Sequence, residues 1–448
     1  MKRLAVLICL LLPLAGFAQQ LTLQDCLDAA SQGNVTVKKT SLGVLAARAQ
    51  QSEARWEYAP KVSVTALAYD ALNPMLRITL RDVLGNSDAA GALTESLTAS
   101  AYENGIKPYY ESFSRGYGVA ATLLQPLYAG GRIATGNRLA DLGVEASGLQ
   151  ERLARRATAD SVESKYWRIV ALQEKQKTVK EAMSMLESLE KDVTSAISAG
   201  LVTESDRTQL HLKKSELEAG SHRLNGSIAL LKMELLDFIG YPYQYSSVGQ
   251  ITLSGSLDSL PSPEEVLADD PSVEGTDEAR LLQLQIDAKE GERKMAVGEL
   301  LPQVAVGASY GYNAMMLPKE GSFNGLVFAM VQIPITDIGK ASARARRYDY
   351  AVQQAQMDRD YLMSQLRLRE AMCRLQVETL WLEIATARDA AHYAQDALQK
   401  AEVRLRAGQA TASDVLQASL AATTAQETLL QKQAAYRSAL CAYRSAKQ

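Results

Sequence analysis

The sequence predicts a mostly helical chain that contains four β-strands and an internal two-fold repeat. Residues 132–199 and 340–407 keep a helical spacing of apolar side chains. At ~1.5 Å per residue, each run would form ~100 Å of helix, far more than an ordinary globular element. Four shorter segments alternate between two kinds of side chain, as strands do. A glycine-centred turn occurs at Gly200 and again at Gly408.

The chain begins with the features of an export signal. Two basic residues precede the apolar residues 4–14, and a small-x-small cleavage site ends at Ala18. We therefore expect residues 1–18 to be a signal peptide that directs the chain across an inner membrane.

Composition argues against several classes of function. Without its signal the chain has 46 basic and 51 acidic residues, an acidic balance that argues against a nucleic-acid partner. Three cysteines outside the signal are too few for a disulfide scaffold. No mature segment is apolar for long enough to form a transmembrane helix. An exported chain of this kind is either periplasmic or enters an outer membrane through strands.

The N-terminal part is predicted to contain two helices. A short helix that starts near residue 21 ends at Gly33, and a second helical run covers residues 35–57. This run must end before Pro60, because proline cannot continue a helix.

Two strands follow in the first half. Alternation predicts them at about 61–70 and 114–125, and the stretch between them is irregular. Residues that break regular structure, Pro126, Gly130 and Gly131, then lead into the first long helix.

The repeated glycine turn has the sequence of a helical hairpin tip. Gly200 and Gly408 each follow a long periodic run and suit the C′ position, because glycine adopts a positive φ without a Cβ clash. An N-cap threonine and an aspartate three residues later then form a capping box in each copy. These pairs are Thr203 with Asp206 and Thr411 with Asp414.

Constant spacings indicate an internal duplication. Gly33 and Gly275 are 242 residues apart, as are Pro60 and Pro302. Later motifs, such as Gly200 and Gly408, are 208 residues apart, so the first copy has an insertion between its two strands. The expected organisation is a signal peptide at 1–18, a first repeat at 19–239 with strands at about 61–70 and 114–125 and a helical hairpin at about 132–238, a connector at 240–274, and a second repeat at 275–448 with strands at about 303–313 and 324–333 and a hairpin at about 340–447.

The strands require other chains. A pair of strands cannot cross a membrane alone, because its edge N–H and C=O groups would face lipid unpaired. Four strands are also too few for a spanning barrel, which has at least about eight. We therefore expect an oligomer.

Over essentially its whole mature length the chain resembles the TolC family of outer-membrane efflux proteins. The resemblance depends on the strand entries, the strand exits and the hairpin tips, in this order and in two copies. The motifs are Tyr58-Ala59-Pro60, Leu301-Pro302, Gln125-Pro126-Leu127-Tyr128-Ala129-Gly130-Gly131, Ile333-Pro334-Ile335-Thr336-Asp337-Ile338-Gly339, the tip at Gly200, and the tip from Arg406-Ala407-Gly408 to Asp414-Val415-Leu416-Gln417-Ala418.

The resemblance implies a TolC-like homotrimer in the outer membrane of a Gram-negative bacterium. Three chains would close a 12-stranded β-barrel that continues into a long α-helical coiled-coil tunnel through the periplasm. The trimer would be the passive exit duct of a tripartite efflux or type I secretion system. It would contact outer-membrane lipid, a periplasmic adaptor protein and an inner-membrane pump of the RND or ABC type. No catalytic residue, cofactor or metal is implied, so the chain would not be an enzyme.

The resemblance also assigns two groups of site residues. The periplasmic entrance at the helix tips would contain Gly200, Thr203, Asp206, Arg404, Arg406, Gly408, Thr411, Asp414 and Gln417. The strand–helix junctions would contain Pro60, Pro126, Gly130, Gly131, Pro302, Pro334 and Gly339. The family often has a second acidic residue at the tip, where this chain has Gln417. The tyrosine and arginine that can lock a closed tip in the family fall on Leu405 and Ala410.

Several of these residues have two interpretations. Asp414 either belongs to an acidic ring at the entrance or only caps its helix with Thr411. Arg404 and Arg406 either bind an adaptor or complement the negative end of the helix macrodipole. Aromatic residues in the strands form interfacial girdles, or are present through ordinary β-propensity. These residues are Tyr69, Tyr117, Tyr310, Tyr312 and Phe328.

Other features stay open as well. The insertion around residues 70–112 is an enlarged extracellular loop or a flap over the barrel mouth. Cys373 and Cys441 are equally far in sequence from the second tip, and either form a disulfide or are separate buried thiols. The alternative function is a periplasmic coiled-coil adaptor that links a pump to a separate channel, although adaptors usually have one helical hairpin per chain. The cargo cannot be inferred from the sequence.

Overall fold

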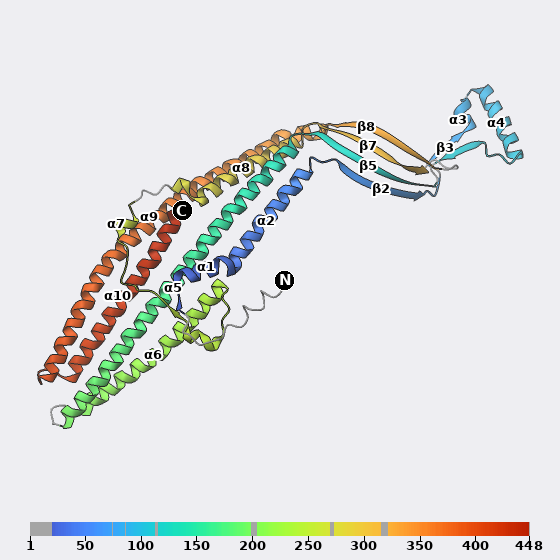
Figure 1. Ribbon diagram of the computed structural model, residues 1–448. Coiled ribbons are helices and arrows are strands. Elements are labelled where there is room, and N and C mark those ends of the chain that lie inside the picture. Colours follow the sequence, from blue (N-terminus) through green and yellow to red (C-terminus); the bar gives the residue numbers. More distant parts are fainter. Residues whose placement is uncertain are drawn as a thin grey trace, which may run out of the picture. The chain divides into compact units, whose positions relative to one another are not determined.

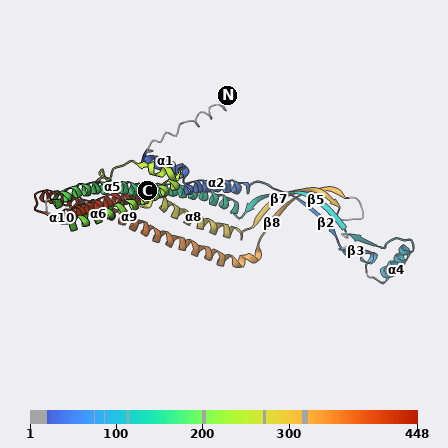
Figure 2. The same ribbon diagram turned by 90° about the horizontal axis from the view of Figure 1, so that it is seen from below.

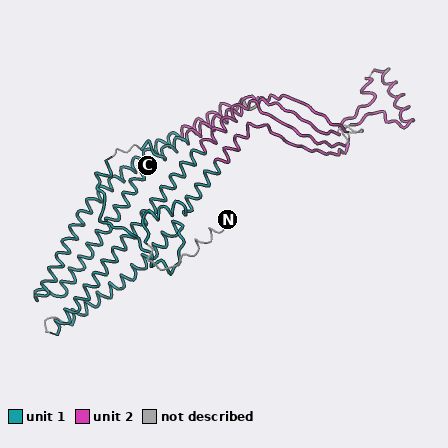
Figure 3. The backbone as a smooth tube through the Cα atoms, in the orientation of Figure 1, with its two compact units in different colours: residues 1–47, 144–285, 355–448 teal, residues 48–143, 286–354 magenta. Residues whose placement is uncertain are grey.

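The computed structural model describes residues 20–73, 75–85, 87–112, 115–198, 204–268, 273–314 and 321–447. The expected signal peptide and the tip residues Gly200 and Thr203 lie outside this part of the chain. The described chain divides into two compact units (Figure 3): unit 1 comprises residues 1–47, 144–285 and 355–448, and unit 2 comprises residues 48–143 and 286–354. Each unit takes segments from both halves of the sequence.

Long helices make up most of the chain (Figure 1). Periodic apolar spacing with few internal breakers lets them extend far beyond the usual length. The main helices are α1 (Leu23–Gly33), α2 (Val35–Trp56), α5 (Arg132–Ser198), α6 (Glu204–Ile239), α8 (Asp277–Gly298), α9 (Ile335–Arg406) and α10 (Ala412–Lys447).

The strands and short elements complete the chain. One antiparallel sheet has the strand order β2-β5-β7-β8, and two smaller two-stranded sheets are present in the described residues. The elements of the main sheet are β2 (Lys61–Asp70), β5 (Arg115–Ala129), β7 (Gln303–Ala314) and β8 (Ser322–Gln332). The others are β1 (Gln20–Leu21), β3 (Leu76–Thr79), α3 (Leu80–Leu84), α4 (Asp88–Glu103), β4 (Tyr109–Ser112), η1 (Tyr245–Gln250), β6 (Thr252–Leu253), α7 (Pro263–Val266) and η2 (Val273–Gly275).

Element bounds follow the spacings found in the sequence. α2 and α8 both contain 22 residues and start 242 residues apart, at Val35 and Asp277. α6 and α10 both contain 36 residues and start 208 residues apart, at Glu204 and Ala412. These matched lengths support the inferred duplication.

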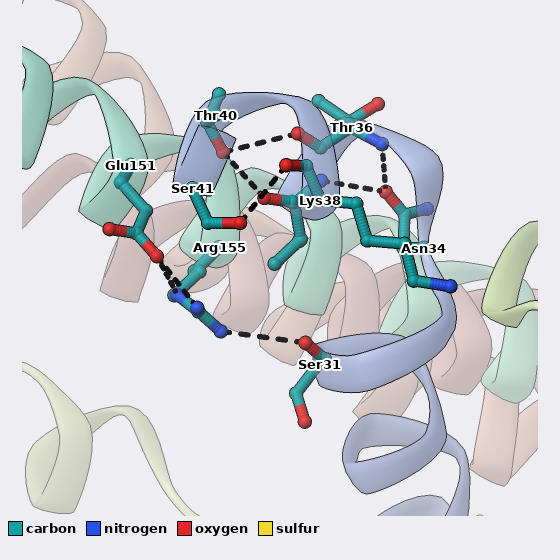
Figure 4. Close-up of polar contacts among 9 residues, drawn as sticks. Ser31, Asn34, Thr36, Lys38, Thr40, Ser41, Glu151 and Arg155 are labelled. Atoms are coloured by element: carbon teal, nitrogen blue, oxygen red, sulfur yellow. Dashed lines mark hydrogen bonds and ion pairs between the residues drawn. The ribbon is translucent and has the colours of Figure 1, made fainter. Parts of the chain in front are cut away.

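The break between α1 and α2 is held by side-chain hydrogen bonds (Figure 4). Asn34 caps α2, since its Oδ1 accepts from the backbone N–H of Thr36 (2.8 Å) and of Val37 (3.3 Å), and its Nδ2 donates to the carbonyl of Phe238 in α6 (2.8 Å). Arg155 of α5 donates to the carbonyl of Ser31 at the end of α1 (3.5 Å). Thr276, 242 residues after Asn34, caps α8 in the same way, because its hydroxyl accepts from the N–H of Ala279 (3.2 Å).

The connector packs on the helices of unit 1, the unit to which it belongs. Side chains of these helices donate hydrogen bonds to its backbone carbonyls. Tyr166 of α5 is fully buried and donates to Ser254, and Lys232 of α6 donates to Ile251. Two neighbouring residues of α10 extend the series: Tyr436 donates to Pro261 (2.8 Å) and Arg437 to Ser259. Since buried carbonyls need partners, these donors allow a nearly strand-free connector to pack on the helices.

Three predictions about individual elements are wrong. The second long helix starts at Ile335, five residues before the predicted residue 340, so Gly339 lies inside the helix and not at a strand–helix junction. β5 continues through Pro126 to Ala129, with a register shift between Pro126 and Tyr128. Proline is tolerated there because the pairing with β2 ends at Leu124, so no partner on that side needs its N–H.

The insertion is the third difference. The sequence predicts an irregular stretch, but the described residues form the two-stranded antiparallel sheet of β3 and β4 and the helices α3 and α4. Thr79 and Asp82 form a capping box for α3, and Ser87 caps α4.

The cysteines are separate thiols. Cys26, Cys373 and Cys441 are all free, which decides against the disulfide alternative. Cys441 is buried and contacts the carboxylate of Asp160 (Sγ to Oδ1, 3.1 Å), and burial raises the pKa of its thiol. None of the described helices is both long and apolar enough to cross a membrane.

Gly240 provides a test of the packing in unit 1. It ends α6 in a Schellman motif with a φ of +69°, and an added Cβ would lie 2.7 Å from the carbonyl oxygen of Gly33. We expect Gly240→Ala to lower the unfolding temperature in circular dichroism, because a side chain here costs about 1–2 kcal/mol in backbone strain alone. Gly220→Ala is the control: this residue is inside α6 and has open space, so the substitution should raise stability slightly. Equal effects would contradict this account.

Candidate functional site

The main sheet of unit 2 consists of β2, β5, β7 and β8 (Figure 2). Its two faces carry different kinds of side chain. The antiparallel register places directly paired residues on the same face, for example Val64 with Ala121, Ala121 with Tyr310, and Tyr310 with Gly325. Alternate residues of each strand point to opposite faces, so the register defines both faces completely.

One face, here called the apolar face, carries no charged side chain along the centre of the strands. Many of its apolar side chains are exposed in the described chain, and Val327 is 85% exposed. The large residues of the apolar face are Val62, Val64, Tyr117, Val119, Leu123, Tyr310, Tyr312, Phe323, Val327 and Val331. An exposed patch of this kind marks a membrane or protein contact.

The opposite face, here called the polar face, consists largely of small and hydroxyl side chains. Thr122 and Ser309 form a hydrogen bond across β5 and β7 (3.1 Å). Gly307 leaves room for the ring of Phe328, since a Cβ there would lie 2.4 Å from that ring. A few apolar residues, including Leu326, are exposed among them.

Aromatic residues gather at the end of the apolar face nearest the β7–β8 connection. Tyr117 stacks on Tyr312 (6.0 Å between ring centroids), and Phe323 contacts both Tyr310 (5.9 Å) and Tyr312 (5.3 Å). Three of the five predicted girdle residues therefore lie in one cluster. Phe323 was missed, although its alternation with Gly325 and Val327 was readable in the sequence.

Two of the predicted girdle residues lie on the wrong side of the sheet. Tyr69 pairs with Gly116, and Phe328 pairs with Gly307, and both pairs belong to the polar face. They cannot contribute to a girdle on the apolar face. Alternation alone implies this result, because Tyr69 and Phe328 lie an odd number of residues from Val64 and Val327 on their own strands and so point to the opposite face.

At the other end of the apolar face, Tyr128 pairs with Val304. Tyr312 lies eight residues further along β7 than Val304. At ~3.4 Å per residue and a tilt of ~40°, the aromatic rings at the two ends are ~20 Å apart along a barrel axis. This height is close to the ~25 Å apolar band of a membrane barrel.

Both outer strands of the sheet have one open edge. Within the described residues β2 pairs only with β5, and β8 only with β7. An open edge flanked by apolar side chains is a template for pairing with another chain.

Glycines at the strand–helix junction allow two backbones to meet. Gly130 has a φ of +64°, and an added Cβ would lie 2.0 Å from the carbonyl oxygen of Gly298 at the end of α8. Gly131 also has a positive φ and precedes α5. Pro60, Pro302 and Pro334 lie directly between helix and strand, as their lack of an N–H suggests.

At the second helix tip, the predicted turn chemistry is present. Gly408 has a φ of +72°, its N–H donates to Leu405 (2.9 Å), and the N–H of Gln409 donates to Arg404 (2.8 Å). These bonds form a Schellman motif that ends α9. The exposed Arg404 and Arg406 lie in the last turn, where cations meet the negative end of the macrodipole.

A capping box starts α10, as predicted. The backbone N–H of Asp414 donates to the Thr411 hydroxyl (3.2 Å), and both the N–H and the hydroxyl of Thr411 donate to the Asp414 carboxylate (2.8 Å each). These hydrogen bonds, with the nearby Arg404, lower the pKa of Asp414. Asp414 and Gln417 are both exposed. The capping role of Asp414 is thus present in a single chain.

The four long helices pack together near the tips in unit 1. A buried apolar cluster joins α5, α6, α9 and α10 through residues such as Leu186, Leu210, Leu398 and Val415. The side chain of Leu405, where the family can have a locking tyrosine, packs against this cluster. The tip is therefore held by apolar packing from within the chain.

The two hairpins differ in a way that sequence reasoning missed. In the first, Glu190 of α5 accepts a hydrogen bond from Lys214 of α6 (3.1 Å), which lowers the pKa of Glu190, and His211 is 3.7 Å away. The residues 208 positions later are Leu398 and Ala422, both buried in the tip cluster. An ion pair in one hairpin thus replaces apolar packing in the other.

Apolar stripes on two helices are exposed to solvent. On α9, Tyr361, Leu368, Met372, Leu375 and Leu382 are spaced like a heptad repeat and are all more than half exposed. Val35, Leu42 and Leu45 are similarly exposed on α2. The spacing of both stripes was present in the sequence as a signal. In the described chain no group of three or more histidine, cysteine or acidic side chains is placed to hold a metal ion.

The cap at Thr411 can be tested separately from any role in the entrance. We expect Thr411→Val to raise hydrogen exchange in the first turn of α10 by roughly three- to tenfold, the usual size for loss of an N-cap. Because the folded-state pKa of Asp414 is lowered, the cap should persist at mildly acidic pH and be lost only as pH falls through that lowered value. Gln417→Ala, on the same helix but outside the capping box, should change neither the hydrogen exchange of the first turn nor the pH at which the cap is lost. Unchanged exchange in Thr411→Val would refute the capping role.

Comparison with known proteins agrees with this geometry. Residues 279–446 match the sequence model of a family described as outer membrane efflux protein. No curated protein sequence matches the chain.

Three solved structures have a similar fold. The outer membrane protein VceC of Vibrio cholerae is 17% identical, with a TM-score of 0.72 over 95% of this chain and 96% of that chain. The CmeC outer membrane channel of Campylobacter jejuni is 13% identical, with a TM-score of 0.73 over 95% and 85%. The open state of the MtrE outer membrane channel of Neisseria gonorrhoeae is 16% identical, with a TM-score of 0.71 over 97% and 93%.

The family match agrees with the predicted outer-membrane location and with the expectation that the chain is not an enzyme, because its description names efflux proteins. The structural likeness establishes the fold over nearly the whole chain. The chain thus has the fold of these outer-membrane channels over nearly its whole length, and within it residues 279–446 match the outer membrane efflux protein family.

Proposed function

We propose that this protein is the outer-membrane exit duct of a tripartite efflux or type I secretion system and acts as a homotrimer. Each chain would contribute its four-stranded sheet to a closed barrel and its long helices to a periplasmic tunnel. A periplasmic adaptor and an inner-membrane pump would meet the helix tips. The duct itself would conduct passively.

The two-faced sheet with two open edges carries the proposal. The apolar face suits lipid, and the polar face suits a water-filled lumen. In lipid, the unpaired N–H and C=O groups of β2 and β8 must be satisfied by another chain. Pairing β8 of one copy with β2 of the next satisfies both edges, and three copies close the ring with twelve strands.

The helices support the same assembly. The exposed stripes lie on α2 and α9, and these helices adjoin the two edge strands in the chain, since α2 precedes β2 and α9 follows β8. Apolar stripes with heptad spacing pack against helices of a neighbouring chain in coiled coils. A head-to-tail contact of this kind closes into a ring when its rotation allows.

The tips are the part that we assign to the entrance. The exposed residues Asp414, Gln417, Arg404 and Arg406 gather where α9 turns into α10. In a trimer, three copies of Asp414 would surround one axis and attract cations. With Gln417 at the second position, this chain would supply one carboxylate ring at this level.

Adjacent residues of β8 separate the lipid-facing role from the lumen-facing one. We expect Val327→Arg, in the centre of the apolar face, to reduce the amount of folded protein in outer membranes, because a cation at the bilayer midplane costs about 2–4 kcal/mol. Leu326→Arg is the matched control, since it lies one residue away, is also exposed and points to the polar face.

Leu326→Arg should assemble normally and shift the ion selectivity of single channels in planar bilayers toward anions. Equal loss of assembly in both variants would contradict the assignment of faces. Normal assembly of Val327→Arg would contradict the membrane contact itself.

A further inference from the structure

The insertion in the first half has no counterpart in the second and is not explained by the duct alone. It comprises residues 71–112 and contains α3, α4 and the two-stranded sheet of β3 and β4. Its described residues include no buried side chain. Two paired strands alone are marginally stable, and an isolated helix of 16 residues is also marginally stable in water. This segment therefore needs cover from outside itself.

The two-stranded sheet of β3 and β4 has one apolar and one polar face. Ile78 pairs with Tyr110 across β3 and β4, and both side chains are exposed. On the other face Arg77 forms an ion pair with Glu111 (3.0 Å) and lies over the ring of Tyr109 (4.1 Å). The polar face is thus satisfied within the chain, whereas the apolar face is left open.

The helices show the same division. Leu93 and Leu97 are one turn apart on α4 and nearly half exposed, while Thr94 and Thr98 are partly covered. Val83 on α3 is 70% exposed. Glu95 lies on a different side of α4 from Leu93 and Leu97, as the helical period of 3.6 residues requires. Apolar side chains in a row on an amphipathic helix indicate a docking face.

We propose that the insertions of neighbouring copies dock on one another through these apolar side chains and form an intersubunit clasp. The inference rests on the proposed trimer. The insertion leaves the sheet from β2, whose open edge is the seam between copies, and β3 begins only six residues after β2 ends. Six residues reach at most ~20 Å, so each insertion is tethered beside the next copy at high effective concentration.

Charge argues against a membrane surface as the occupant. Residues 71–112 contain five acidic and three basic side chains. Of the three cations, Arg77 is held by Glu111 and Tyr109, and Lys107 lies 5.9 Å from the Tyr109 ring. A net negative segment with its cations engaged is unsuited to anionic lipid head groups.

Cysteine cross-linking in intact outer membranes tests the clasp. We expect Leu97→Cys, treated with a short bis-maleimide, to give covalent dimers of this chain in denaturing gels. Glu95→Cys is the matched control on the same helix and should give several-fold less product. The unsubstituted protein gives the background from Cys26, Cys373 and Cys441, which are buried or half-buried.

A second variant reports on stability. Leu93→Ser with Leu97→Ser should lower the temperature at which the detergent-solubilised trimer dissociates, whereas Glu95→Ser should not. If the wild-type protein is a trimer but the Leu97→Cys variant gives no cross-links, the clasp is wrong and the duct still stands. Cross-links to a protein of another mass would also overturn it. A wild-type protein that is monomeric in membranes would refute the trimer as well.

Discussion

Unpaired backbone groups at the two edges of one sheet are the constraint on which the rest of this structure depends. A four-stranded sheet with a lipid-compatible face cannot leave β2 and β8 open in a membrane. In the proposed trimer, other copies would pair with these edges and enclose the polar face. The long helices that enter and leave the strands would then form the wall of the same ring, and their exposed stripes on α2 and α9 would be contacts between copies.

The fixed geometry is concentrated at the junctions. Gly130 and Gly298 bring the backbones of a strand exit and a helix end within contact distance, and Gly33 and Gly240 do the same beside the connector. Larger residues would separate these elements. The hairpins differ in how they are held, since an ion pair at Glu190 and Lys214 in the first takes the place of buried Leu398 and Ala422 in the second. The two halves therefore have similar backbone folds, but the first hairpin depends on an ion pair at a place where the second depends on apolar packing.

Much of this fold could be predicted from sequence because it depends on local signals. Helical period, alternation, proline breaks and the Thr411–Asp414 capping box are all properties of neighbouring residues. The errors have different causes. The girdle prediction for Tyr69 and Phe328 ignores alternation, because each lies an odd number of residues from Val64 or Val327 on its own strand and so points to the other face. The end of β5 depends on pairing between distant segments, because a proline is tolerated in the strand only beyond the point where β2 stops pairing, and the sequence alone does not show that point. The elements of the insertion are harder to predict because they are short, and the apolar spacing of α4 depends mainly on Leu93 and Leu97.

The most direct test of the central claim is the mass of the assembled protein extracted from the outer membrane, measured by native mass spectrometry in detergent. The account predicts a single species of three identical chains in the membrane fraction, since only additional copies can pair the open edges of β2 and β8. A monomer that is released with the soluble periplasmic proteins would contradict it.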